Sequence, residues 1–311
     1  MFRRVRSSGR TRGSRKRGSR KRNSRKRGCL QVSGLPPGAF QATQGTLSDG
    51  QQAPRQNNMP GMTGKRILVT GASSGIGRAT AERFLADGAT VTLVGRRRSA
   101  LAEAAKYGKG KAFLIEADLS NEQQTEACVA ESAEKMGGLD VLVNAAGILK
   151  SGSLEATSLE LWDEMMNINV RSIFHLMRLA APHLEHSKGN IVNVSSVTGL
   201  RSFPGVLAYC VSKAAVDQLT RCVALELAPK GVRVNAVNPG VVVSGLHRSG
   251  GMAEDAYAKF LEHSKTTHPL GRVGEPGEIA DLICFLASDR AGWITGATVS
   301  IDGGRALTCA R

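Results

Sequence analysis

Several features are missing from this 311-residue sequence, and each absence excludes a class of protein. The six cysteines form no CxxC pair and no histidine lies near them at metal-ligand spacing, so we expect reduced thiols and no bound metal. No apolar run reaches the roughly 18 residues that a membrane-spanning helix needs. The N-terminus also lacks the apolar stretch of a secretory signal. These absences favour a protein of a reducing compartment without a membrane span.

Acidic residues are nearly absent from the first 62 positions. This segment holds 15 of the 42 Lys and Arg but only one of the 26 Asp and Glu, Asp49, so its net charge is +14. The rest of the chain keeps 27 basic and 25 acidic residues, a net charge of +2. The total of +16 therefore belongs to the N-terminal segment, and it does not predict nucleic-acid binding by the remainder.

The basic segment repeats an Arg-Lys-Arg unit three times between positions 15 and 27. Because like charges at this density repel and little apolar surface is available, we expect residues 1–62 to be a disordered tail and linker. Three interpretations of this segment stay open. It is a presequence, it is a nuclear or polyanion-binding tract, or it is an extension without function. The repeat has no apolar face, which counts against the presequence. These readings place the protein in the cytoplasm or mitochondrial matrix, and less readily in the nucleus.

From Lys65 onward, short runs rich in Val and Ile alternate with longer helical patterns, which is typical of βαβ units. The predicted strands are Arg66–Thr70, Thr90–Gly95, Ala112–Glu116, Val141–Asn144, Asn190–Ser195, Arg233–Val237 and Thr298–Ile301. The predicted helices are Gly75–Asp87, Ser99–Tyr107, Gln123–Met136, Glu160–Leu184, Ala208–Ala228 and Pro276–Leu286. Right-handed crossovers place helices on both faces of such a sheet. We therefore expect one α/β domain over 63–311, a doubly wound, Rossmann-type fold with a parallel seven-stranded sheet.

A glycine-rich turn, TGASSGIG, follows the first predicted strand at positions 70–77. Glycines at GxxxGxG spacing let the backbone turn sharply and approach a pyrophosphate, which then lies over the N-terminus of the next helix. A turn without a ligand is the alternative, but the strand before it and the helix after it favour nucleotide binding. The predicted contacts are Gly71, Ser73, Ser74, Gly75, Ile76 and Gly77.

The end of the second predicted strand should face the adenosine ribose. Proteins that prefer NAD carry a carboxylate there, whereas this sequence continues from Gly95 into three arginines, Arg96–Arg98. Guanidinium groups suit a 2′-phosphate, so we expect NADP(H) rather than NAD(H), with Arg96 as the contact. A solvated basic loop is the alternative. The loops after the third and fourth strands supply further candidates, Asp118, Leu119, Asn144, Ala145 and Gly147.

The sequence YCVSK places Tyr209 and Lys213 four residues apart, on one face of a predicted helix. A phenol with a pKa of about 10 is a poor acid or base at neutral pH, and a nearby ammonium is expected to lower that pKa. Ser196 ends the fifth strand, and its hydroxyl can stabilise charge that develops on a substrate oxygen. Taken singly, a YxxxK pair or a strand-end serine is commonplace, and the serine would usually be a cap.

Together, Thr70–Gly77, Asn144–Gly147, Asn169, Ser196, Tyr209–Lys213 and Pro239–Gly240 resemble the short-chain dehydrogenase/reductase family over nearly all of 63–311. The ending Ile301–Gly304 agrees with its compact 3-oxoacyl-(acyl carrier protein) reductase-like form. The resemblance implies hydride transfer between NADP(H) and a carbonyl or secondary alcohol, with Tyr209 as acid/base, and a homotetramer.

The resemblance also assigns roles to single residues. It implies that Asn169, with Asn167 as the competitor, supports a proton-relay water near Lys213. The nicotinamide carboxamide is assigned to Pro239, Gly240, Val242 and Ser244. Ser244 stands where the family usually has Thr, and it keeps the hydroxyl.

The substrate is poorly specified by the sequence. We expect a variable lid over Val243–Leu270, in which Leu246, Met252, Tyr257 and Phe260 contact substrate or pack a helix on the body. His247 and His268 border the lid and are assigned surface or capping roles. Two other functions stay open. A non-catalytic nucleotide-binding scaffold would be expected to lack a catalytic residue, and a polyanion-binding protein driven by its tail would need a basic body.

Overall fold

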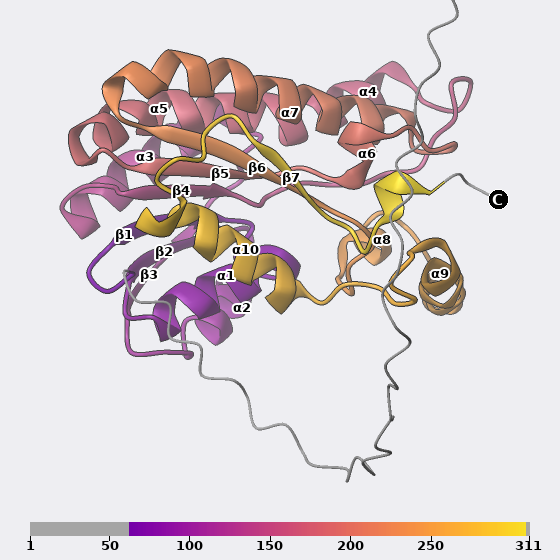
Figure 1. Cartoon of the computed structure of the whole chain (residues 1–311), viewed down its shortest axis with the longest axis horizontal. Helices are drawn as coiled ribbons and strands as arrows, with labels where there is room; N and C mark the ends of the chain where they lie inside the picture. Colours follow the sequence, from indigo (N-terminus) through magenta and orange to yellow (C-terminus); the bar gives the residue numbers. More distant parts are fainter. Residues whose placement is uncertain (1–61, 309–311) are drawn as a thin grey trace, which may run out of the picture. The chain divides into compact units, whose positions relative to one another are not determined.

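The structure, a computed structural model, describes residues 62–308, and its central feature is the predicted seven-stranded parallel sheet (Figure 1). The strands pair in the order β3-β2-β1-β4-β5-β6-β7. Their bounds are β1 Arg66–Thr70, β2 Thr90–Gly95, β3 Lys111–Glu116, β4 Val141–Asn144, β5 Asn190–Val194, β6 Arg233–Pro239 and β7 Thr298–Ile301. Every pairing is parallel, and each predicted strand is present with its ends within two residues. The Rossmann-type prediction is therefore confirmed.

Helices cover both faces of the sheet (Figure 1). On one face lie α1 (Gly75–Ala86), α2 (Arg98–Ala104) and α10 (Pro276–Ala287), and on the other lie α3 (Glu122–Met136), α5 (Ser172–Ser187) and α7 (Leu207–Leu227). Strand side chains alternate between the two layers, as the pleat requires. Ile67 and Val69 of β1 pack with the first group of helices, and Leu68 packs with the second.

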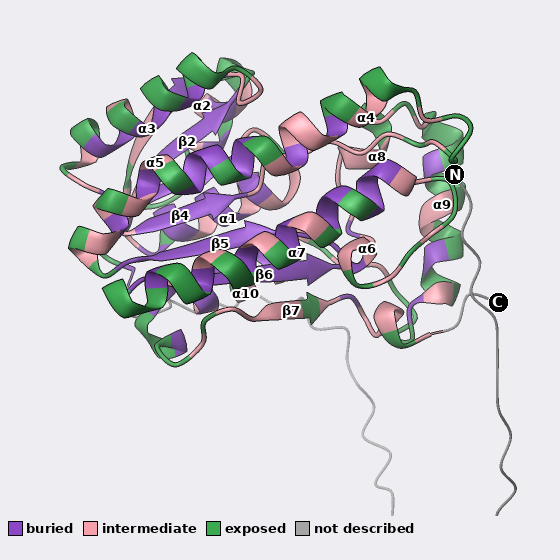
Figure 2. Cartoon of the chain, turned by 90° about the horizontal axis from the view of Figure 1, so that it is seen from above, coloured by how far each residue is buried: buried purple, intermediate pink, exposed green. Residues whose placement is uncertain are grey.

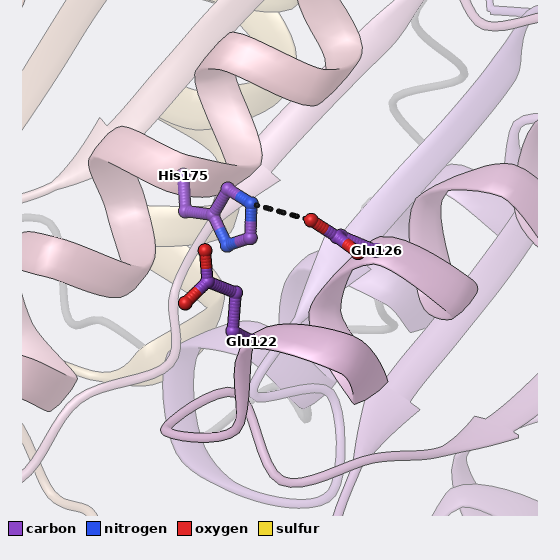
Figure 3. Close-up of side chains that lie close together, drawn as sticks. All are labelled: Glu122, Glu126 and His175. Carbon is purple, nitrogen blue, oxygen red and sulfur yellow. Dashed lines mark ion pairs between the residues drawn. The ribbon is translucent and has the colours of Figure 1, made fainter.

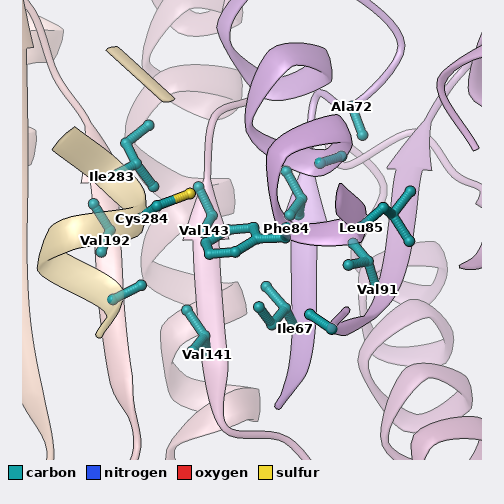
Figure 4. Packing of buried hydrophobic residues seen from close by; sticks show 14 of the residues in the cluster. Ile67, Ala72, Phe84, Leu85, Val91, Val141, Val143, Val192, Ile283 and Cys284 are labelled. Atoms are coloured by element: carbon teal, nitrogen blue, oxygen red, sulfur yellow. The ribbon is translucent and has the colours of Figure 1, made fainter. Parts of the chain in front are cut away.

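The first of these cores is built around aromatic and aliphatic side chains from α1 and α10 (Figure 4). Phe84 and Leu85 of α1, together with Cys284 of α10, are fully buried against β1, β2 and β4. Burial raises the pKa of the Cys284 thiol, so this cysteine is an inert core residue. The central strands are buried along their length, whereas β7, at the edge, is only partly covered (Figure 2).

The predicted helix Glu160–Leu184 is divided in the structure. It consists of α4 (Leu159–Met166), a π-helical segment (Asn167–Arg171) and α5. A π-helical turn inserts one extra residue into the helical ladder, and such turns often occur at functional sites. The prediction of one continuous helix over Glu160–Leu184 is therefore wrong at this segment.

Shorter elements complete the described chain. α6 (Val197–Leu200) follows β5, while α8 (Leu246–Ser249) and α9 (Glu254–Thr267) form the predicted lid region. Met62, which the sequence prediction placed in the tail, is fully buried in the core, so the folded body begins at or before this residue. The basic repeat lies outside the described residues. Within 62–308, no helix combines the length and the apolar character needed to cross a membrane.

The strand order changes direction between β1 and β4, since β2 and β3 follow on one side and β5 to β7 on the other. In open α/β sheets, ligands bind at the carboxyl ends of the strands where this reversal occurs. The glycine-rich turn after β1 and the Asn144–Gly147 loop after β4 therefore flank the crevice where a ligand is expected.

Candidate active site

The turn after β1 passes close to the loop after β4, and this approach is possible because glycines in the turn carry no side chain. A Cβ at Gly71 would lie 2.8 Å from the carbonyl carbon of Ala145, and one at Gly77 would lie 2.5 Å from the Gly71 oxygen. Gly71 and Gly75 also have positive φ angles, of 65° and 55°. No other residue type fits this turn without displacing backbone.

Two further features make this turn suitable for a pyrophosphate. The Thr70 hydroxyl accepts hydrogen bonds from the amides of Ala145 and Ala146, at 3.1 and 3.2 Å, which fixes the two loops to one another. Ser74 precedes α1, but its side chain does not cap the helix, so first-turn amides stay free to donate to an anion. Ser73 lies beside the end of β2, 3.3 Å from where a Cβ of Gly95 would lie, and Ile76 packs on the core.

Arg96 is exposed at the end of β2, as are Arg97 and Arg98. It lies near Asp118 at the end of β3. Hydrogen bonds from the Ser120 amide and hydroxyl hold the pKa of Asp118 below its ordinary value, and Arg96 adds to this lowering. Asp118 Oδ1 accepts from the Ser120 hydroxyl and amide, at 2.7 and 2.9 Å, and the Asp118 amide donates to Gln124 Oε1 at 2.8 Å. A cofactor contact by Asp118 is therefore expected at Oδ2. Leu119 packs partly against the core.

Asn144 turns its side chain into the sheet rather than into the crevice. Its Nδ2 donates to Asn193 Oδ1 at 2.8 Å, and the residue is 1% exposed. The Asn144 side-chain amide is therefore engaged within the sheet, so a cofactor contact from this loop is expected from backbone atoms of residues 144–147. Gly147 lies deeper, where a Cβ would be 3.2 Å from Asn169 Oδ1 and 3.7 Å from Lys213 Nζ. The loop thus passes directly beside two of the predicted catalytic residues.

Asn169 lies in the π-helical segment and is completely buried. Its Oδ1 accepts from the Ile148 amide and its Nδ2 donates to the Ile148 carbonyl, both at 2.9 Å. This side chain therefore fixes the loop after β4, and it is already fully engaged before any water binds. Asn167, the competing candidate, instead turns toward Ser120, whose carbonyl accepts from its Nδ2 at 3.4 Å. The structure places Asn169, not Asn167, beside Lys213.

Tyr209 and Lys213 lie on the inner face of α7, 5% and 4% exposed. The Lys213 ammonium donates to the Val194 carbonyl at 2.8 Å and lies 5.7 Å from the centre of the Tyr209 ring. Ser196 is buried at the start of α6, and its Oγ accepts from the Thr198 amide at 3.1 Å. Ser196 is thus the N-cap of α6, which is the structural role that a serine at the end of a strand usually has. It is also a hydrogen-bond partner of Tyr209.

The ionisation of this pair differs from the sequence expectation. Burial raises the pKa of Tyr209 to about 12, and the hydrogen bond with Ser196 only partly opposes this. Burial also lowers the pKa of Lys213 to about 8. The expected lowering of the tyrosine pKa is therefore wrong for this arrangement, because burial of the phenol outweighs the opposing hydrogen bond with Ser196. Tyr209 is held as a neutral phenol at neutral pH.

The loop after β6 is anchored by the lid helix at two points. Tyr257 of α9 is buried, accepts from the Ser244 amide at 3.1 Å and donates to the Ser244 carbonyl at 2.9 Å. His268 follows α9, and its Nε2 accepts from the Val241 amide at 3.1 Å. Ser244 Cβ also lies 3.4 Å from where a Cβ of Gly75 would be, so the loop faces the glycine-rich turn.

These contacts decide between the alternatives left open for the lid. His268 is 3% exposed, so the surface role is wrong and the capping role is confirmed: it ends α9, and its Nδ1 lies 2.7 Å from the Ser264 carbonyl oxygen. Its ring fits there because Gly240 carries no side chain, since a Cβ would lie 2.8 Å from Nε2. Tyr257 packs on the body and is not free to contact substrate. His247 is half-buried and packs against Phe260 with the rings tilted by 44° and their centroids 4.6 Å apart. Pro239 and Val242 are both buried.

A second group of ionisable side chains joins α3 to α5 away from the crevice (Figure 3). Glu122 and Glu126 flank the buried His175, whose Nε2 lies 3.6 Å from Glu126 Oε1, and the three ligand atoms lie within 4.8 Å of one another. Arg171 already pairs with Glu122 at 3.0 Å. Because Glu122 already pairs with Arg171 and the group joins two packed helices, we assign it to helix packing. Sequence spacing could not predict it, since the residues come from two helices.

Comparison with known proteins agrees with this geometry. The family model described as enoyl-(acyl carrier protein) reductase matches residues 71–306. The meso-2,3-butanediol dehydrogenase of Serratia marcescens is 39% identical over 241 residues, covering 77% of this chain and 94% of that protein. The 3-oxoacyl-[acyl-carrier-protein] reductase of Thermotoga maritima is 38% identical over 247 residues, which cover 78% of this chain and 98% of that protein.

Solved structures show the same likeness. A short-chain dehydrogenase/reductase of unknown function from Caenorhabditis elegans, solved with cofactor, superposes with a TM-score of 0.75 at 33% identity, covering 80% of this chain and 97% of that one. The aldohexose dehydrogenase of Thermoplasma acidophilum superposes with a TM-score of 0.73 at 34% identity, and the match covers 80% of this chain and 97% of that one. Family model, relatives and structures all cover the described body, and the chain therefore belongs to the short-chain dehydrogenase/reductase family.

Proposed function

We propose that this protein is an NADP(H)-dependent oxidoreductase that interconverts a carbonyl group and a secondary alcohol, with Tyr209 as the acid/base. The observation that carries the proposal is the enclosure of Ser196, Tyr209 and Lys213 at the carboxyl ends of the strands, beside a turn that only glycines can form. Such a turn at a helix N-terminus fits a dinucleotide. When bound, the nicotinamide supplies a hydride to the carbonyl carbon.

The protein residues provide the proton and the polar environment. In carbonyl reduction the Ser196 hydroxyl donates a hydrogen bond to the substrate oxygen, and Tyr209 gives that oxygen its phenolic proton. Lys213 stabilises the phenolate that remains until it is reprotonated. A buried phenol whose pKa is raised to about 12 carries its proton at neutral pH, which is the form that carbonyl reduction requires.

The preference for NADP(H) rests on charge at the end of β2. Arg96, Arg97 and Arg98 are exposed there, and no carboxylate occupies the position that repels a 2′-phosphate. Asp118 lies close to Arg96, but its pKa is held low chiefly by hydrogen bonds from Ser120, which leaves the guanidinium able to bind a second anion. These features support Arg96 as the phosphate contact.

A substrate panel tests the proposed reaction. Aldehydes, ketones, sugars, vicinal diketones and 3-oxoacyl thioesters would be offered with NADPH or NADH, and loss of reduced cofactor would be followed by absorbance. We expect turnover of at least one carbonyl class and a preference for NADPH. If the protein bound NADPH but neither reduced any carbonyl with NADPH nor oxidised any alcohol with NADP, that result would favour the non-catalytic scaffold instead.

We also propose a homotetramer, acting in the cytoplasm or mitochondrial matrix on a small molecule. Exposed apolar side chains on α5, α7 and the segment before β7 support association, among them Phe174, Leu225 and the fully exposed Trp293. Sedimentation velocity of the full chain distinguishes a tetramer from a monomer. Nucleic-acid binding through the tail would appear as weak, steeply salt-dependent retention that a chain starting at Met62 lacks.

A further inference from the structure

A third ionisable residue on α7 lies in line with the catalytic pair. Asp217 follows Lys213 by four residues, as Lys213 follows Tyr209, so all three lie on one helix face. Asp217 is 1% exposed. The proposed function uses Tyr209 and Lys213 and leaves this buried carboxylate without a role.

The Asp217 carboxylate is held in one position by its neighbours. Asn238 Nδ2 donates to both of its oxygens, at 3.1 and 2.9 Å, and to the carbonyl of Ser196 at 2.9 Å. A Cβ at Gly199 would lie 2.4 Å from Asp217 Oδ2, so any side chain there would displace the carboxylate. One amide group therefore joins the buried acid to the backbone of a predicted catalytic residue.

Asp217 and Lys213 lie one helical turn apart on the buried face of α7, where a negative charge on the first favours the protonated form of the second. Burial lowers the pKa of Lys213, and Asp217 is the charged group that opposes this lowering among residues 62–308. Burial raises the pKa of Asp217, opposed by hydrogen bonds from Ser195 and Asn238 and then by the charges of Arg221 and Lys213. Arg221 is exposed and therefore screened by solvent, whereas Lys213 is enclosed with Asp217.

The other groups around the pair carry no charge. Ser195, Gly199 and Asn238 face Asp217 from the end of β5, from α6 and from β6, and Gly147 and Asn169 face Lys213. Among residues 62–308, Arg221 and Lys213 are the charged groups that act on Asp217, and Asp217 is the charged group that acts on Lys213. The electrostatic environment of Lys213 is thus set by burial on one side and by Asp217 on the other.

We propose that Asp217 is a positioning residue for this active site: its buried carboxylate is the counter-charge that keeps Lys213 protonated, and through Asn238 it holds the backbone of Ser196. The inference rests on the proposed function, in which Lys213 acts as an ammonium. Asp217 thus adds a supporting residue to the proposed active site, one helical turn beyond Lys213 on α7.

Direct titration of Lys213 tests the proposal without requiring turnover. Lysine labelled with ¹³C at Cε would be followed by NMR against pH in cofactor-free protein, with Lys213→Arg identifying the resonance. Asp217→Asn keeps the shape and removes the charge, whereas Asp217→Ser removes both. Thr220→Val is the matched control, because Thr220 is equally buried on α7 and accepts a hydrogen bond from Asn193 Nδ2 at 2.9 Å, but it carries no charge.

We expect the Lys213 midpoint to fall by about one pH unit, a tenfold change in proton affinity, in both Asp217 variants and to stay in place in Thr220→Val. The alkaline limb of the rate of carbonyl reduction, near pH 8 in the unmodified protein, should move down by the same amount. An unchanged midpoint in both variants, or failure of both to fold, would overturn the proposal. An unmodified protein that turns over no substrate would overturn the proposed function, while the NMR titration would still report the coupling.

Discussion

On the β1–β3 side of the crevice the protein presents backbone and exposed charge, whereas on the β4–β6 side it encloses polar side chains. The first side offers free amides at the start of α1 and the exposed guanidinium of Arg96. The second side buries Asn169, Tyr209 and Lys213 almost completely. Solvent screens the groups on the first side, so each contributes modest binding energy, while desolvation shifts the pKa values on the second side strongly. The first side should therefore set cofactor affinity and the second should set the reaction rate.

The largest expected effect is that of Tyr209→Phe. Removing the hydroxyl takes away the proton donor and leaves the ring to fill the same space, so turnover should fall by about 10²- to 10⁴-fold. NADPH affinity, measured by fluorescence titration, should stay close to that of the unmodified protein. Near-normal turnover with any substrate would show that another group supplies the proton.

Arg96→Asp tests the opposite side of the crevice. It replaces attraction for the 2′-phosphate with repulsion, and a charged hydrogen bond is worth roughly 1.5–3 kcal/mol, or about ten- to a hundredfold in affinity. NADPH binding should weaken by that factor, and the preference over NADH should narrow or reverse. Equal affinity of the unmodified protein for both cofactors would remove the basis of this assignment.

A smaller effect is expected where the lid helix anchors the loop after β6. Tyr257→Phe removes two hydrogen bonds to the Ser244 backbone and leaves the buried ring in place. If this loop binds the nicotinamide carboxamide, NADPH affinity should fall by about two- to tenfold. Calorimetry with 2′-phospho-ADP-ribose, which lacks nicotinamide, provides the control. If Tyr257→Phe weakened the binding of NADPH and of 2′-phospho-ADP-ribose equally, the contact between Tyr257 and Ser244 would only maintain the fold.

The smallest effect is expected from removing the basic segment. A chain that begins at Met62 keeps the buried methionine side chain and loses residues that carry +14 without apolar periodicity. Its melting temperature and its NADPH-dependent rate should match those of the full chain. Loss of folding or of cofactor binding would show that the tail belongs to the catalytic body.

The sequence was sufficient for the strands and for the glycine-rich turn, because both depend on local patterns. Valine-rich runs define β1 and β2, and the glycine spacing reflects close backbone approach at Gly71 and Gly77. The pairing of Tyr209 with Lys213 follows from helical periodicity alone.

Features that depend on distant segments were missed or misjudged. The burial of His268 depends on Gly240, from the end of β6, which leaves room for its ring. The direction of the Tyr209 pKa depends on how completely the fold excludes water, which a motif does not reveal. Asp217 could have been noticed from the four-residue spacing, but its partner Asn238 lies on β6 and is brought near only by folding.

Single-turnover hydride transfer tests the division between the two sides most directly. Unmodified protein, Arg96→Asp and Tyr209→Phe would each be saturated with NADPH and mixed rapidly with a carbonyl substrate found in the panel, and the loss of NADPH absorbance would be timed. We predict that saturated Arg96→Asp transfers hydride at the unmodified rate, while saturated Tyr209→Phe is slower by about a hundredfold or more. Equal slowing of both variants, or an unmodified rate in Tyr209→Phe, would contradict the account.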